Sequence, residues 1–124
     1  MKTNDLSRLS AIARMMRDRE LAKVEGIVAH MNRLRADIAR IEEARDARSR
    51  DTGLDAARLL GADVAWLAAT EEQLTRAQAQ MAMLRVTHEN ALREARRAFG
   101  RSDVLGTLSD DAAAKARRPK DPDD

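Results

Sequence analysis

Residues 24–41 read VEGIVAHMNRLRADIARI, and six large apolar residues of this stretch recur at alternating steps of three and four. They are Val24, Ile27, Met31, Leu34, Ile38 and Ile41. Such steps place the side chains along one face of a helix, which is the heptad signature of helices that pack along a shared line of side chains, here called the seam. The stretch therefore predicts a long amphipathic helix packed against another helix.

A second stripe of the same kind follows a break near residues 50–53. Its apolar members are Ala57, Leu60, Val64, Leu67, Leu74 and Met81, with Glu71 and Gln78 at two further seam positions. Within the break, Gly53 can adopt the positive φ of a tight turn, and Thr52 with Asp55 resembles a capping box. A short connection between long helices favours antiparallel packing.

The two stripes are mutually consistent when the chain folds back at this turn. Leu34 then faces Leu67, and Met31 faces Glu71. We therefore predict an all-α fold in which residues 1–100 form an antiparallel coiled-coil hairpin, with helices at about 5–50 and 54–99.

Both ends of the hairpin carry further signals. The early stripe (Leu6, Leu9, Ala13 and Met16) reaches Val24 eleven residues after Ala13, which predicts a stutter that relaxes the supercoil. At the other end Gly100 is a natural C-cap after Phe99. We expect residues 101–124 to form a flexible tail, with a short alanine-rich helix near 110–118.

The composition fits this fold. Of the 124 residues only 2% are aromatic and 35% are charged, which is typical of long helices without a thick core. There is no cysteine, which excludes disulfides. No apolar run approaches the ~18 residues that span a bilayer, so the expected location is the cytoplasm or the inner face of the membrane.

The side chains that carry chemistry are scattered. His30 and His88 are the only histidines, and neither belongs to a metal-binding or catalytic pattern. The adjacent acidic pairs at 42–43 and 71–72 point apart on a helix, and no glycine-rich phosphate loop is present. We therefore expect a protein that is not an enzyme and has no metal or cofactor.

Positive and negative charges are mixed along the chain, and the formal net charge is only +2. The best candidate for an anionic partner is a basic stretch made of Arg85, Arg93, Arg96, Arg97 and Arg101. Glu89 and Glu94 interrupt it, and it lacks the interleaved aromatics that stack on bases. A solvated helix face is the favoured interpretation, and a nucleic-acid role is disfavoured.

Trp66 stands beside the predicted seam on a weaker second stripe with Leu59, Ala62 and Ala69. Tryptophan is enriched at the energetic centres of protein interfaces. The stripe therefore predicts contact with a different protein, packing against another copy in a four-helix dimer, or packing within the chain.

A two-helix chain of this length, with a leucine-rich start and a charged tail, resembles the bacterial FliJ and YscO group of type III secretion components. The resemblance rests on Leu6-Ser7-Arg8-Leu9 followed by residues 14–23, and it covers residues 3–100. It implies a non-enzymatic stalk inside the ring of the flagellar or type III export ATPase. It also implies contacts with the cytoplasmic domain of the export gate and the escort of export chaperones.

Carried onto this chain, the resemblance places the ATPase-facing end at residues 6–16 and 92–100, and the export-gate contact at the flank of Trp66. The partner-binding candidates are Leu6, Leu9, Met16, Leu59, Trp66, Leu92 and Phe99. The chain departs from the group in being shorter than many members and in its acidic final residues. Two alternatives stay open, a self-associating coiled-coil adaptor or scaffold and a basic helical protein that associates with nucleic acid.

Overall fold

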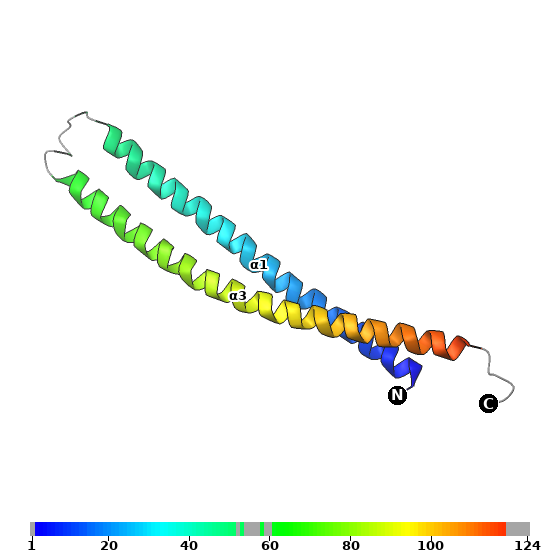
Figure 1. The fold of residues 1–124 in the computed structure, drawn as a ribbon. Helices are drawn as coiled ribbons and strands as arrows, with labels where there is room; N and C mark the ends of the chain where they lie inside the picture. The colour runs from blue at the N-terminus through cyan, green and yellow to red at the C-terminus, as the bar shows by residue number, and fades with distance from the viewer. Residues whose placement is uncertain (1, 52, 54–57, 59–60, 119–124) are drawn as a thin grey trace. The chain divides into compact units, whose positions relative to one another are not determined.

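The computed structural model describes residues 2–51, 53, 58 and 61–118. Two long helices packed against each other make up almost all of this part, α1 (Thr3–Arg50) and α3 (Ala62–Arg117) (Figure 1). No strand occurs in these ranges. The predicted all-α class with two packed helices is confirmed.

The chain divides into two compact units. The terminal unit contains Met1–Glu25 and Glu89–Asp124, and the connecting unit contains Gly26–His88. In each unit a segment of α1 packs antiparallel to a segment of α3. In the connecting unit, for example, Arg48 near the end of α1 pairs with Asp63 near the start of α3.

The seam of α1 keeps an unbroken heptad rhythm, and the predicted stripe over residues 24–41 is confirmed. Its buried and half-buried residues are Leu6, Ser10, Ala13, Arg17, Glu20, Val24, Ile27, Met31, Leu34, Ile38, Ile41, Arg45 and Arg48. The predicted stutter is wrong, because the eleven residues from Ala13 to Val24 are one heptad plus the four-residue step within a heptad. Leu9 and Met16 lie beside the seam, and Ser10 and Arg17 take the positions predicted for them.

The seam of α3 is shifted from the predicted one. Thr70, Leu74, Ala77 and Met81 are buried, whereas the predicted seam residues Val64 and Leu67 are 73% and 44% exposed. The predicted and observed patterns share Leu74 and Met81. The observed pattern buries Thr70 and Ala77. The predicted pattern would have buried Glu71 and Gln78 instead. The observed pattern avoids the cost of burying a carboxylate and an amide.

The core of the connecting unit brings Met31 and Leu34 of α1 together with Ala77 and Met81 of α3. The predicted facing pairs, Met31 with Glu71 and Leu34 with Leu67, are therefore wrong. The reason is the length of the connection, because α1 ends at Arg50 and α3 begins only at Ala62. Each α1 residue consequently meets α3 further along the chain than a turn at residue 53 would place it.

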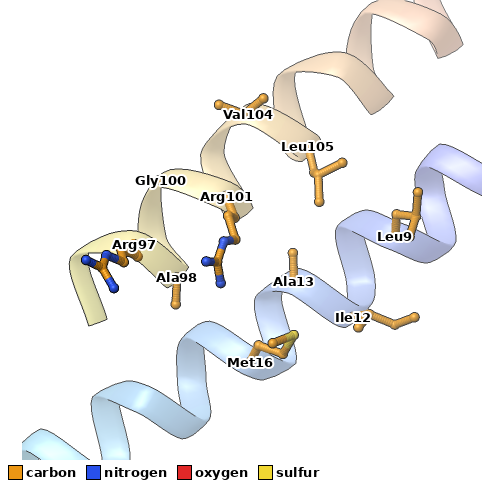
Figure 2. A pocket seen from close by; sticks show the side chains of 10 residues that line it. All are labelled: Leu9, Ile12, Ala13, Met16, Arg97, Ala98, Gly100, Arg101, Val104 and Leu105. Atoms are coloured by element: carbon orange, nitrogen blue, oxygen red, sulfur yellow. The ribbon is translucent and has the colours of Figure 1, made fainter. Parts of the chain in front are cut away.

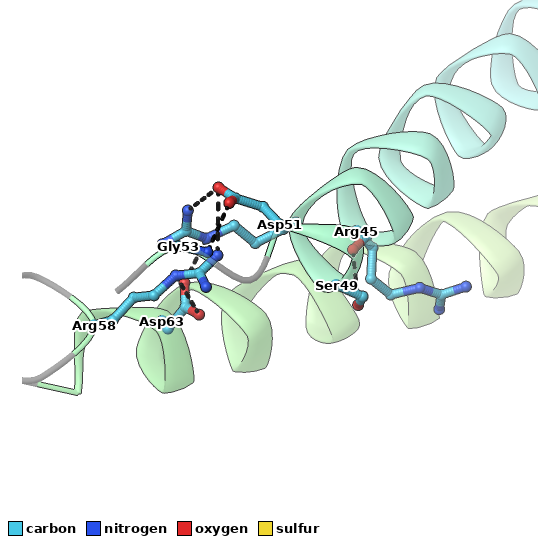
Figure 3. A network of polar contacts seen from close by, with 7 residues as sticks. Arg45, Ser49, Asp51, Gly53, Arg58 and Asp63 are labelled. Carbon is cyan, nitrogen blue, oxygen red and sulfur yellow. Dashed lines mark hydrogen bonds and ion pairs between the residues drawn. The ribbon is translucent and has the colours of Figure 1, made fainter. Parts of the chain in front are cut away.

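The connection is tied to both helices by charged side chains (Figure 3). Arg48 Nε donates to Asp63 Oδ1 at 2.6 Å, and Arg58 contacts carboxylate oxygens of Asp51 at 3.5 Å and Asp63 at 3.4 Å. The backbone N–H of Gly53 donates to Asp51 Oδ1 at 3.1 Å. These ion pairs and hydrogen bonds link the end of α1, the connection and the start of α3.

Further into the helices, Arg45 Nη1 donates to Glu71 Oε1 at 3.2 Å. This hydrogen bond raises the pKa of Arg45 above its usual value. The start of α3 is marked by Gly61, whose φ of 82° lies in the left-handed region. The predicted capping box of Thr52 and Asp55, and the predicted seam residues Ala57 and Leu60, lie outside the described residues.

At its other end α3 runs to Arg117 without a break at Gly100 or Gly106. The predicted helix end at residue 99, the C-cap at Gly100 and the start of a flexible tail at residue 101 are therefore wrong. Ser102, Leu105 and Ser109 extend the seam at steps of three and four, which gives this segment a packed face. Residues 119–124 of the predicted tail lie outside the described part of the chain.

In the ranges that the structure describes, neither helix contains an apolar segment of the kind that crosses a bilayer.

Candidate functional site

The most buried seam positions around Ala13 and Ala98 in the terminal unit hold small side chains. Ser10 and Ala13 of α1, and Ala95, Ala98 and Ser102 of α3, are all buried, with exposed fractions between 4% and 7%. Small side chains at a helix contact let the two axes approach closely. They also leave the larger apolar side chains of both helices outside the seam.

Several of these larger side chains form an apolar groove of about 540 Å³ along one side of the seam (Figure 2). Its lining residues are Leu9, Ile12, Ala13 and Met16 of α1 with Arg97, Ala98, Gly100, Arg101, Val104 and Leu105 of α3. Ile12, Met16 and Val104 are 52%, 51% and 59% exposed. We take this groove as the candidate interaction site, because its exposed side chains are apolar and adjacent.

A polar groove lies on the opposite side of the same seam. It is lined by Ser7, Ser10, Arg14 and Arg17 of α1 with Ser102, Asp103, Gly106, Thr107, Ser109 and Asp110 of α3. At 3.6 residues per turn, Ile12 and Arg14 diverge from Ala13 in opposite directions around α1. The terminal unit is therefore amphipathic, with an apolar and a polar side.

The structure divides the predicted partner-binding residues of the terminal unit between these surfaces. Leu9 and Met16 line the apolar groove. Leu6 and Leu92 are half-buried. Phe99 lies instead below Arg17, whose guanidinium carbon is 5.5 Å from the ring centroid, and Arg17 belongs to the polar groove. The predicted residues thus do not form one surface.

Trp66 lies in the connecting unit. It is 39% exposed and lines a small pocket together with Arg48, Ala62 and Asp63. Its neighbours Val64 and Leu67 are also exposed, so the start of α3 presents apolar side chains to solvent. Leu59, the other residue predicted for this flank, lies outside the described residues.

The residues of the apolar groove that sequence reasoning did not name as partner-binding candidates include Ile12, Val104 and Leu105. Val104 and Leu105 fall in the segment predicted to be a tail. From the sequence, Arg97 and Arg101 stand out only as members of a basic stretch. The sequence does contain a signal for this groove. Ala95 and Ala98 continue the heptad of α3, and this register places residues 97, 101 and 104 beside the seam.

Two arginines supply the charge of the apolar groove. Arg97 Nη1 donates to Glu94 Oε1 at 2.8 Å, so this guanidinium has a partner on its own helix. Arg101 extends from α3 toward α1 (Figure 2), and no carboxylate of the described residues forms an ion pair with it. The groove therefore combines an apolar floor with a positive edge.

The described residues hold no group of three or more histidine, cysteine, aspartate or glutamate side chains arranged to bind a metal ion. His30 is exposed, and His88 is half-buried at a seam position. The chemistry that the terminal unit offers to a partner is burial of apolar surface together with hydrogen bonds from guanidinium groups.

No protein-family model, curated protein or solved structure matches this chain.

Proposed function

We propose that this chain is a non-enzymatic helical docking component of a flagellar or type III protein export apparatus, acting as the stalk of the export ATPase and as an escort of export chaperones. The observation that carries the docking role is the apolar groove of the terminal unit. Ile12, Met16 and Val104 of this groove are each more than half exposed, while alanine and serine occupy the buried positions between the helices beside them. The assignment to an export apparatus rests on the resemblance of residues 3–100 to the FliJ and YscO group.

The stalk role is tested by titrating the export ATPase from the same organism with this protein and measuring the rate of ATP hydrolysis. Light scattering of the same mixtures reports ring assembly. We expect the wild-type chain to raise the rate and to promote assembly.

Leu9→Asp is the informative variant for this role. A carboxylate in the apolar groove opposes burial of the groove against a partner, so we expect stimulation of the ATPase to be lost. Met15→Asp is the matched control, because Met15 is 70% exposed on the same helix and does not line the groove. Full stimulation by Leu9→Asp, with helicity unchanged by circular dichroism, would count against the stalk role.

The export-gate contact is assigned to the connecting unit at Trp66. Since Trp66 is 39% exposed and outside the core cluster, we expect Trp66→Ala to keep the helical content and to weaken binding to the cytoplasmic gate domain. Surface-immobilised gate domain measures the affinity, and circular dichroism measures helicity. A large loss of helicity would assign Trp66 to folding instead.

A self-associating scaffold is the second candidate, and the exposed side chains of Val64, Trp66 and Leu67 favour it. An apolar patch on the connecting unit is suited to packing against a second copy. Light scattering of the protein alone separates the two candidates, since a stalk is a monomer before it meets the ring. A stable dimer that Leu67→Glu dissociates would favour the scaffold.

A further inference from the structure

We propose that the apolar groove of the terminal unit accepts one amphipathic α-helix of a partner protein, with an apolar stripe of about two turns and carboxylates beside that stripe. The inference rests on the docking role proposed above and adds the chemistry of the partner segment. Its basis is the shape of the groove, the charge at its edge and the composition of the other candidate occupants.

The dimensions of the groove fit a helix. Along α1 its lining runs from Leu9 to Met16, which is about two helical turns or ~10 Å at a rise of 1.5 Å per residue. A helix that lies in a groove between two helices inserts side chains at steps of three and four. Two turns of such a stripe would cover the exposed parts of Ile12, Met16 and Val104.

The charge at the edge of the groove selects the flanks of that helix. Arg101 lines the groove and forms no ion pair with the described carboxylates, and Arg97 lies one turn away on α3. A partner that covers the groove removes water from Arg101, and a guanidinium that loses water needs an acceptor. A carboxylate matches the planar guanidinium through two parallel hydrogen bonds.

A second copy of the chain fits the groove less well. If two grooves faced each other, Arg97 and Arg101 of one copy would lie near the same residues of the other, and like charges across an interface oppose association. Residues 119–124 of this chain, PKDPDD, carry carboxylates but no large apolar side chain to fill the groove. The apolar floor and the positive edge together favour an acidic amphipathic helix from another protein.

Three designed fluorescent peptides of about four helical turns test the inference. The first has a leucine stripe flanked by glutamate, the second has the same stripe flanked by lysine, and the third has the glutamates but a scrambled stripe. Fluorescence anisotropy with the full-length chain measures binding. We expect the first peptide to bind and the other two to bind at least tenfold more weakly.

Variants assign the binding to the groove. Arg101→Glu is expected to weaken the glutamate-flanked peptide at least tenfold and to strengthen the lysine-flanked peptide. Arg96→Glu is its control, because it makes the same charge change on an exposed residue of α3 that does not line the groove. Ile12→Ser is expected to weaken the first peptide, while Met15→Ser, the control on α1, leaves it unchanged.

Equal binding of the first and third peptides, or no response to Arg101→Glu and Ile12→Ser, would overturn the inference. So would a dimer of the protein alone that Ile12→Ser dissociates, because the occupant would then be a second copy. The ATPase titration is a separate readout. Peptide binding without ATPase stimulation would support the inference and contradict the stalk role. ATPase stimulation without peptide binding would support the stalk role and contradict the inference.

Discussion

At the scale of single residues, Gly26 and Gly61 differ in backbone conformation, because Gly26 is helical and Gly61 has a positive φ. Both lie inside the helix ranges that the sequence predicts, about 5–50 and 54–99. In the structure Gly26 lies inside α1, is exposed, and has no atom within 4 Å of where a Cβ would lie. Gly61 has equally open surroundings, but it precedes α3 with a φ of 82°. Only the backbone angle separates the two positions.

We therefore expect Gly26→Ala to raise the free energy of unfolding by about 0.5–1 kcal/mol, because alanine restricts the unfolded chain and favours the helix. Gly61→Ala should lower it by about 1–2 kcal/mol, because a residue with a Cβ is strained in the left-handed region. Urea unfolding followed by circular dichroism measures both changes. Shifts of the same sign for the two variants would contradict the assigned backbone conformations.

At the scale of the helices, the small-residue seam of the terminal unit determines how closely α1 and α3 approach there. Ala98 is 5% exposed on that seam and also lines the floor of the apolar groove. A larger side chain at this position has no space between the helices unless they separate. The same substitution should therefore affect both packing and the shape of the groove.

We expect Ala98→Leu to lower the free energy of unfolding by about 1–3 kcal/mol, which is the usual cost of overpacking a closely packed contact. Ala114→Leu is the control, because Ala114 is exposed on the same helix and leucine is nearly as good a helix former as alanine. Thermal unfolding of the two variants beside wild type gives the comparison. Equal stability of Ala98→Leu and Ala114→Leu would mean that the helices do not approach closely at this seam.

The helices also show how much of the fold can be predicted from the sequence. The apolar steps from Val24 to Ile41 were enough to predict α1 and its seam, because large aliphatic residues occupy every position there. The pattern failed where the seam is small or polar. The sequence pattern assigned Leu9 and Met16 to the seam in place of Ser10 and Arg17. Apolar periodicity favours the larger apolar residue and carries no information about the distance between the helices.

The same limit explains why the candidate site was only half predicted. Leu9 and Met16 were named as partner-binding residues, and the structure places both in the apolar groove. They had been read as seam residues, however, and the facing wall at Val104 and Leu105 was missed because Gly100 reads as a helix end. A glycine inside a helix costs only about 1 kcal/mol, which the continued seam at Ser102 and Leu105 offsets.

At the scale of the whole molecule, the two units differ in what holds them together. The connecting unit has a cluster of large apolar side chains, in which Met81 is 4% exposed and packs with Met31 and Leu34. In the terminal unit, apart from Val24, the buried seam positions hold alanine and serine. Since burial of apolar area is the main favourable term in folding, most of the stability should lie in the connecting unit.

We expect Met81→Ala to lower the free energy of unfolding by at least about 2 kcal/mol, within the usual range for a buried methionine. Met83→Ala, at a residue that is 72% exposed two positions away, should change it by less than about 0.5 kcal/mol. Hydrogen exchange should show slower amide exchange around residues 27–38 and 74–84 than around residues 6–17. Uniform exchange across the helices would contradict this division of stability.

The apolar groove also has a consequence for synthesis of the protein on the ribosome. One wall comes from residues 9–16 and the other from residues 97–105, so the first wall emerges while the second has not been translated. At about 5–20 residues per second, the interval is on the order of several seconds. A nascent or prematurely terminated chain therefore has leucine, isoleucine and methionine on a lone helix but no groove. Any partner that requires both walls discriminates finished copies of the protein from unfinished ones.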